Sequence, residues 1–253
     1  MIIAVVNQKG GVGKTTVAVN LANRLAQNAR VLLVDCDPQG DATSTCGIEV
    51  TSEMNTLNDV MAAIAGGVPA SAVAREAIVS AGAEWGFDVI PANRALASRE
   101  TDTALGREFR LQNALEALTG AYEHIVLDCP PSLGMMTSNA LVAADMAVVV
   151  THPRETATNG VAEVFTTIHA VRRLYNPKLK KVAIVINEHI KARTNVTEWV
   201  EALREYYSDY LIEDMLPKHE HIARANSDHK PIVAGKEECV DNVFAQLVNK
   251  CRQ

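Results

Sequence analysis

The chain lacks the features that mark membrane-spanning and disulfide-stabilised proteins. Its 253 residues contain no run of about 18 apolar residues, so no segment is expected to cross a bilayer. The five cysteines are odd in number and have no Cys-x-x-Cys spacing, which argues against a disulfide framework or a zinc site and fits a reducing cytosol. The N-terminal apolar run is too short for a signal peptide. These absences together predict a cytoplasmic protein.

The chain also has no excess of positive charge. Lys and Arg number 24 against 30 Asp and Glu, which gives a net charge of −6. Any binding to nucleic acid must therefore come from a local patch. The sequence contains no internal repeat and no low-complexity linker. The length and an apolar content of 48% predict one domain, residues 1–253, with a sizeable core.

Short apolar runs alternate with helical patterns along the chain. Near-continuous apolar runs predict strands at residues 2–6, 31–34, 87–90, 124–127, 146–150 and 182–186. Apolar periodicity predicts helices at residues 15–27, 57–64, 109–118, 136–143, 160–174, 196–207 and 240–251. This alternation indicates an α/β fold, a doubly wound and mostly parallel sheet flanked by helices on both faces. Ligands are then expected beyond the carboxyl ends of the strands.

A glycine-rich loop joins the first predicted strand to the first predicted helix. Strand, glycine-rich turn and helix are the setting of a phosphate-binding loop, because successive backbone N–H groups and the helix start can face one anion. Lys14 would reach the β- and γ-phosphates of a nucleotide, and the Thr15 hydroxyl would bind Mg²⁺. The alternative is a turn that binds nothing, which the flanking strand and helix disfavour. The residues expected to bind nucleotide here are Lys9, Gly10, Gly11, Val12, Gly13, Lys14, Thr15 and Thr16.

Carboxylates end two other predicted strands. Asp35 and Asp37 follow the second strand, where they could orient water or surround a metal ion. The alternative for this pair is an Asx turn before Pro38. Asp128 ends an apolar run and precedes a Pro-Pro pair, which is a Walker B arrangement. Its carboxylate is expected to hold Mg²⁺, together with Thr15.

These segments resemble the ParA/MinD/nitrogenase iron protein group of ATPases, and within it ParA/Soj-type DNA-partitioning ATPases. The loop has the group's deviant form, in which Lys9 leads a Gly-Gly pair and Gln8 stands where the general pattern has glycine. The resemblance implies that Lys9 crosses a dimer interface to the partner's nucleotide. It also implies that Asp37 positions the attacking water and contributes to the metal site. Lys9, Lys14 and Asp37 are thus the expected catalytic residues.

The resemblance further assigns residues to adenine and to DNA. Asn187 would hydrogen-bond the adenine ring, and the backbone near Pro217 would lie against it. The Lys191–Asn195 segment resembles an Arg-Thr-Asn element whose arginine binds DNA without sequence preference. Residues 217–226 match less well, because histidine and arginine stand where many ParA proteins have arginine and glutamate. The expected DNA contacts are Arg193, Lys191, Arg224 and Lys218.

The charge distribution supports a DNA-binding surface independently of the resemblance. Between residues 169 and 193 the only acidic residue is Glu188, and the net charge of this stretch is +6. We expect one positive face on an acidic body. The alternative is an ordinary solvated helix end. The basic residues are Arg172, Arg173, Lys178, Lys180, Lys181, Lys191 and Arg193.

Two further features each leave two interpretations. His219, His221 and His229 could hold a metal ion, but their loop-and-helix setting lacks a tight ligand spacing and favours a surface role. The last predicted helix has an apolar face, which could bind a membrane as in MinD proteins. Packing on the domain is preferred because this tail has few basic residues. Residues 41–83 suggest no chemistry.

The sequence therefore predicts an ATPase that uses ATP and Mg²⁺. With ATP it would form a homodimer, bind DNA non-specifically and associate with the nucleoid. Hydrolysis, slow until a ParB-like or adaptor protein stimulates it, would release the DNA. The alternatives are a positioning ATPase for a protein cargo such as a carboxysome or chemoreceptor cluster, a MinD-like membrane-associated regulator, and a nucleotide-gated module with negligible turnover. No stable membrane association is expected.

Overall fold

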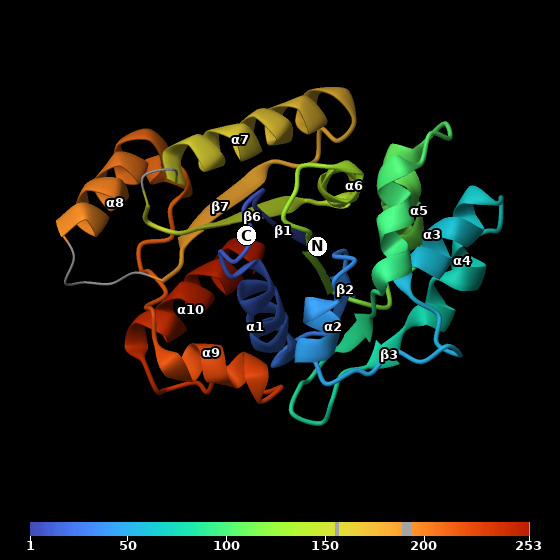
Figure 1. Cartoon of the computed structure of the whole chain (residues 1–253), viewed down its shortest axis with the longest axis horizontal. Coiled ribbons are helices and arrows are strands. Elements are labelled where there is room, and N and C mark those ends of the chain that lie inside the picture. The colour runs from blue at the N-terminus through green and yellow to red at the C-terminus, as the bar shows by residue number, and fades with distance from the viewer. Residues whose placement is uncertain (155–156, 189–193, 253) are drawn as a thin grey trace.

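The computed structural model describes residues 1–154, 157–188 and 194–252, and a seven-stranded sheet runs through them (Figure 1). The strand order is β3-β4-β2-β5-β1-β6-β7. Every neighbouring pair is parallel except β3 and β4, which pair antiparallel at one edge. The strands are β1 (Ile2–Val6), β2 (Val31–Asp35), β3 (Val79–Ser80), β4 (Asp88–Ile90), β5 (His124–Asp128), β6 (Met146–Thr151) and β7 (Lys181–Ile186).

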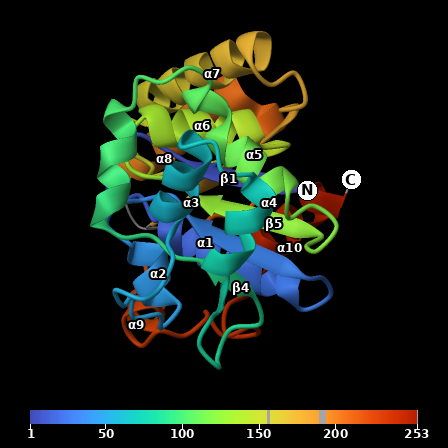
Figure 2. The ribbon, with the colours of Figure 1, turned by 90° about the vertical axis from the view of Figure 1, so that its right-hand side faces the viewer.

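Helices cover both faces of the sheet, which confirms the doubly wound α/β fold (Figures 1 and 2). One face packs against α1 (Lys14–Ala26), α2 (Asp41–Thr45), α9 (Glu220–Ser227) and α10 (Glu238–Arg252). The other packs against α3 (Leu57–Ala65), α4 (Ala70–Val73), α5 (Arg110–Glu116), α6 (Met135–Ala143), α7 (Ala157–Leu174) and α8 (Thr194–Tyr207).

The strands read as continuous apolar runs because both of their faces are buried. In β1, Ile3 and Val5 belong to the core beneath α1, whereas Ala4 and Val6 belong to the core on the opposite face. All four side chains are fully buried. A strand with one solvated face would alternate apolar and polar residues, so this pattern by itself requires two helical layers.

The predicted strands are all present, and the predicted helices are present with bounds shifted by three residues or fewer. The sequence analysis gave no bounds for β3, which has two residues, or for the short helices α2, α4 and α9. The elements β3, α2 and α4 have five residues or fewer and are too short to show a period, and α9 has one buried residue. In addition, 3-10 helices occupy Arg75–Ala77, Arg94–Thr101, Arg107–Phe109 and Ser208–Tyr210.

The C-terminal helix α10 packs on the domain, as the sequence predicts. Val243, Phe244 and Leu247 are buried in the core that α10 shares with α1. Arg24 on α1 pairs with Asp241 at 2.7 Å, and its guanidinium lies 5.8 Å from the centre of the Phe244 ring. The apolar face of α10 is therefore already occupied. Within the described residues, no helix has the length and apolarity needed to cross a membrane.

Candidate active site

The glycine-rich loop leaves β1 and turns directly into α1. Gly11 and Gly13 have φ angles of +70° and +89°, in the left-handed region that glycine enters without a steric penalty. Gly13 is the N-cap of α1, so Lys14 and Thr15 begin the helix. Lys14 Nζ donates to the carbonyl oxygen of Lys9 at 3.2 Å, across the loop. Burial lowers the pKa of Lys14, and the neighbouring Asp128 carboxylate opposes this shift.

A second strand end closes against this loop. Asn187 follows β7 and its Nδ2 donates to the carbonyl oxygen of Val12 at 2.9 Å. The amide lies so close to Gly13 that a Cβ on Gly13 would overlap with it. Glycine at residue 13 is thus required twice, by its φ angle and by the contact with Asn187.

Replacing Gly13 with alanine is expected to destabilise the protein more than replacing Gly11. Both variants place a Cβ on a left-handed residue, which costs about 1–2 kcal/mol. Gly11 has open space around its Cβ position, whereas Gly13→Ala also displaces Asn187, a further cost of about 1–3 kcal/mol. Urea denaturation of both variants measures the difference in the free energy of unfolding. Equal losses would show that the Asn187 contact imposes no constraint.

Three carboxylates lie at the carboxyl ends of β2 and β5. Asp35 and Asp128 are partners in the parallel register and both are fully buried. Asp35 supports the following loop, because its Oδ2 accepts from the backbone N and the hydroxyl of Thr43 at 2.8 and 2.7 Å. Burial raises the pKa of Asp35 to about 6. Burial, and next the charge of Asp35, raises the pKa of Asp128 well above its ordinary value.

The residues around Asp128 fit a divalent cation. Asp128 Oδ2 accepts from the Thr15 hydroxyl at 2.7 Å, while its buried Oδ1 has no hydrogen-bond partner among the described residues. An unpaired buried carboxylate oxygen is costly unless a cation offsets it. Asp37 supplies a second carboxylate, and burial raises its pKa as well. Carboxylate and hydroxyl oxygens are the donors that Mg²⁺ prefers.

A cavity of about 750 Å³ opens over the loop. It collects predicted residues from four segments: Gly10, Gly11, Gly13, Lys14, Thr15, Thr16, Asp37, Asn187 and Pro217. The loop residue Val12 has a buried side chain. Asp128 is connected to the cavity by the hydrogen bond that it accepts from Thr15. The side chain of Lys9 lies beside α7. A Cβ atom built on Gly160 of that helix would be 3.4 Å from Lys9 Cε. The space and polarity of the cavity suit a nucleoside triphosphate.

Sequence reasoning missed the cavity walls formed by α2 and α9. Asp41, Ser44 and Thr45 line one wall, and Ile222, Ala223 and Asn226 line another. Asn226 Nδ2 donates to the Thr16 hydroxyl at 2.6 Å and so ties α9 to the start of α1. The position of α2 directly after the Asp37 loop could have indicated that it lines the cavity. We find no comparable signal for α9.

The chain beyond Asp128 is held by a distant carboxylate that was also missed. Glu100 accepts from the backbone N of Met135 at 2.7 Å and of Met136 at 3.2 Å. The first N–H groups of a helix have no carbonyl partner within the helix, and a negative charge beside them is favourable. A Cβ on Gly134 would overlap with the same carboxylate. Glu100 therefore fixes the end of the segment that follows Asp128.

The expected positive face stays a prediction, because the structure describes only some of its basic residues. Arg172 and Arg173 are in the last turn of α7 and Lys181 begins β7, so the described basic residues of this stretch lie toward the amino end of β7. Lys218 is exposed beside the cavity and pairs with Glu188 at 3.2 Å. Arg224 is exposed on α9 and pairs with Asp228 at 3.5 Å. Lys191 and Arg193 lie outside the described residues.

The three histidines separate into two locations. His219 and His221 approach one carboxylate, that of Glu237. His229 lies elsewhere, with its Nδ1 2.6 Å from the carbonyl oxygen of Ser44.

Comparisons with known proteins show the family of this chain. An AAA domain family model matches residues 1–181. The sporulation initiation inhibitor protein Soj of Bacillus subtilis (strain 168) is 38% identical over 236 residues, 92% of this chain and 90% of the relative. The chromosome partitioning protein ParA of Caulobacter vibrioides is 35% identical over 94% of this chain and 88% of its own. The cell division protein PomZ of Myxococcus xanthus is 30% identical over 96% and 77%.

Solved structures show the same fold. Cobyrinic acid a,c-diamide synthase from Mycobacterium smegmatis, with a bound ATP analogue and magnesium, has a TM-score of 0.81 at 30% identity, covering 98% of this chain and 92% of that one. A variant of McdA from Cyanothece in complex with ATP has a TM-score of 0.88, covering 98% and 95%. At 18% identity, the second likeness shows the fold alone.

Proposed function

This chain belongs to the ParA/Soj family of ATPases, and from that premise we propose that it is a DNA-partitioning ATPase. The observation that carries the proposal is the grouping of a phosphate-binding loop, Asp37 and the Thr15–Asp128 pair at one large cavity. Among the described residues, one buried oxygen of Asp128 in that group has no hydrogen-bond partner. Such an arrangement is suited to binding a nucleotide with its metal ion and to activating water beside it.

Each residue of the site has a role in hydrolysis. The loop N–H groups and Lys14 bind the phosphates, and Asn187 and Pro217 bind the adenine. Thr15, Asp37 and Asp128 would hold Mg²⁺, which would supply positive charge that offsets the charge on the phosphates. Asp37 orients the attacking water by accepting a hydrogen bond from it. Lys14 stabilises the negative charge that develops as the phosphoryl group is transferred.

ATP binding joins two chains in this proposal, with Lys9 reaching the partner's nucleotide. Lys9 and Lys14 are already connected, because the Lys9 carbonyl accepts from Lys14 Nζ. We expect the loss of a phosphate at Lys14 to alter this hydrogen bond and so to affect Lys9. Turnover is slow until a ParB-like or adaptor protein stimulates it, and hydrolysis separates the dimer.

The proposed DNA contacts are Lys191, Arg193, Lys218 and Arg224. Lys218 lines the nucleotide cavity, and Arg224 is on the helix that forms its wall. Nucleotide binding and DNA binding therefore share structural elements. The dimer doubles the number of phosphate contacts, which makes DNA binding dependent on ATP and places the protein on the nucleoid.

Binding to non-specific duplex DNA tests this function. With ATP and Mg²⁺ the purified protein is expected to bind, and binding should weaken steeply between two salt concentrations. With ADP or no nucleotide, binding should be lost. Arg193→Gln and Arg224→Gln should each lower the slope of log affinity against log salt by about 2, because a dimer carries two copies of each residue.

Arg173→Gln is the matched control, because Arg173 is exposed in the last turn of α7. This turn lies toward the amino end of β7, whereas the nucleotide cavity lies at its carboxyl end. Its slope should equal that of the parent protein. ATP-dependent dimers without DNA binding would contradict the partitioning function. Slopes lowered equally by all three arginine variants would show that the DNA contacts include the last turn of α7.

A positioning ATPase for a protein cargo is the second candidate. It is favoured by His221 and Arg224, which depart from the ParA pattern on the helix beside the cavity. Cross-linking of the ATP-bound protein in its own cells would identify the partner, and the purified partner should then stimulate hydrolysis. A stimulating partner that binds DNA supports partitioning, whereas one that resides on a protein body supports positioning.

A further inference from the structure

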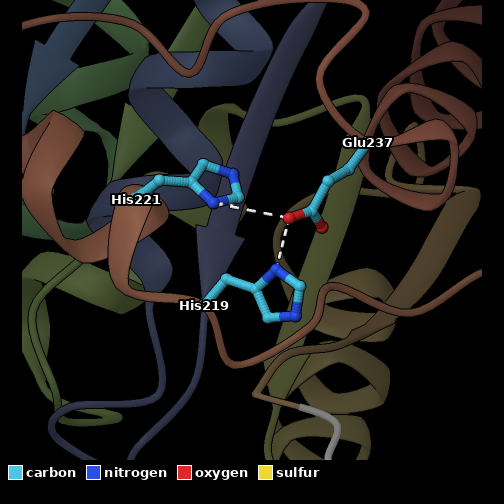
Figure 3. Close-up of side chains that lie close together, drawn as sticks. All are labelled: His219, His221 and Glu237. Carbon is cyan, nitrogen blue, oxygen red and sulfur yellow. Dashed lines mark hydrogen bonds and ion pairs between the residues drawn. The ribbon is translucent and has the colours of Figure 1, made fainter.

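His219, His221 and Glu237 converge where α9 and α10 begin (Figure 3), and His219 also lines the nucleotide cavity. Both imidazoles turn their Nδ1 atoms toward the same carboxylate oxygen, Glu237 Oε1. The two rings lie 5.6 Å apart between centroids, at an angle of 70°. The three donor atoms all lie within 4.8 Å of one another.

From this geometry we propose that His219, His221 and Glu237 form a binding site for Zn²⁺ or a chemically similar transition-metal ion. In a tetrahedral site with bonds of about 2.0–2.2 Å, the donor atoms lie about 3.3–3.5 Å apart. His221 Nδ1 and Glu237 Oε1 are 3.4 Å apart and already have this spacing. His219 lies closer to Glu237, and its exposed side chain has room to move outward around an ion.

The backbone holds these side chains in fixed places. Glu237 precedes α10, and its carbonyl accepts from the backbone N of Val240 and of Asp241, both at 3.1 Å. His219 is the N-cap of α9, and its carbonyl accepts from Ile222 N at 3.2 Å. His221 is in the first turn of α9. Donors placed on helix starts lose little freedom when they bind an ion.

The donor set determines the class of ion. Two imidazoles and a carboxylate suit Zn²⁺, Ni²⁺ or Cu²⁺, whereas Mg²⁺ prefers oxygen donors and would remain at Asp128. Cys239 adds a soft donor nearby, with its Sγ 3.9 Å from Glu237 Oε2. Three ligands leave a fourth position for water or another donor.

The site has a consequence for the nucleotide cavity, which rests on the proposed function. His219 lines the cavity, as do Pro217 and Lys218 before it and Ile222 after it. An ion shared by His219, His221 and Glu237 would tie this wall to the start of α10. ATP and the ion would then each increase the affinity for the other by the same factor.

Zinc binding to the nucleotide-free protein tests the site without relying on ATP. After chelator treatment and removal of the chelator, titration calorimetry with Zn²⁺ alone should show one ion per chain. Co²⁺ in its place should give the visible absorption of a tetrahedral complex. His221→Gln and Glu237→Gln should each lower the affinity for Zn²⁺ at least about 10-fold, because even outer-shell losses cost that much.

His169→Gln is the matched control, since His169 is exposed on α7 and outside the cluster. It should bind Zn²⁺ as the parent does, and circular dichroism should show all variants folded. No stoichiometric binding by the parent, or unchanged affinity in His221→Gln and Glu237→Gln, would overturn the site.

A second measurement compares ATP affinity with and without Zn²⁺, in the parent and in His221→Gln. The parent alone should bind ATP several-fold more tightly with Zn²⁺. An unchanged ATP affinity in the zinc-bound parent would overturn the link to the cavity. A protein that binds Zn²⁺ but no ATP in either state would instead contradict the proposed ATPase function.

Discussion

Replacing Asp37 with alanine is expected to lower the rate of ATP hydrolysis by about 100-fold or more. Asp37 Oδ1 accepts from Gln39 N at 3.0 Å, and the described residues place no hydrogen-bond donor on its Oδ2. That oxygen is therefore available to a water molecule in the cavity. ATP binding should survive, because Lys14 and the loop are unchanged. Steady-state phosphate release measures turnover, and equilibrium ATP binding measures affinity.

The matched variant Asp37→Asn separates charge from loop shape. Its side-chain oxygen can still accept from Gln39 N and preserve the turn, but it carries no negative charge. If the carboxylate itself orients water, both variants should be equally slow while ATP-dependent dimers persist in light-scattering measurements. Recovery of turnover in Asp37→Asn would mean that Asp37 acts only by shaping the loop.

Replacing Asp128 with asparagine is expected to abolish turnover and to stabilise the nucleotide-free protein. Asparagine can still accept from the Thr15 hydroxyl, but it removes a charge that is fully buried opposite Asp35. The gain in the free energy of unfolding should be about 1–3 kcal/mol at neutral pH, measured by urea denaturation in EDTA. Adding ATP and Mg²⁺ should stabilise the parent much more than the variant.

The free energy of unfolding is expected to fall as pH rises, because two buried carboxyl groups have raised pKa values. The pKa of Asp35 is about 6 in the folded protein against an ordinary value of 3.8, and that of Asp128 is raised further by burial and by Asp35. A folded state that holds protons more tightly is favoured at low pH. The stability from these protons is complete below about pH 4 and is lost as pH rises through the folded pKa values.

Asp128→Asn should therefore flatten the decline of stability as pH rises above about 4, because one of the two interacting carboxylates is gone. Asp209→Asn, at an exposed aspartate, serves as the control and should leave the profile unchanged. A variant less stable than the parent at neutral pH would show that the Asp128 charge is already compensated in the folded protein.

Burial on both faces made the strands predictable, and the same reasoning could not find the short elements. Residues 2–6 and 146–150 are continuous apolar runs because two helical layers enclose them. Strand β3 has two residues at the sheet edge, and α9 has one buried residue, Ile222. Neither carries enough apolar surface to leave a period in the sequence.

The candidate site divides in the same way. Lys14, Thr15 and Asp128 meet because adjacent parallel strands end at one edge, which a sequence pattern can predict. Glu237 joins His219 and His221 only because the chain from α9 returns to begin α10 beside them. Glu100 reaches α6 from a 3-10 helix distant in the sequence. Contacts of this kind depend on tertiary packing, so they cannot be predicted from the spacing of residues along the sequence.

Two backbone amides that donate to Glu100 at the start of α6 can report movement of this segment by hydrogen exchange. Met135 N and Met136 N exchange their hydrogens with solvent only when their bonds to Glu100 open. If the segment after Asp128 shifts when the γ-phosphate is lost, deuterium uptake at these two amides should change between the ATP and ADP states. The hydrolysis cycle could then be followed by mass spectrometry in the unlabelled, unmodified protein.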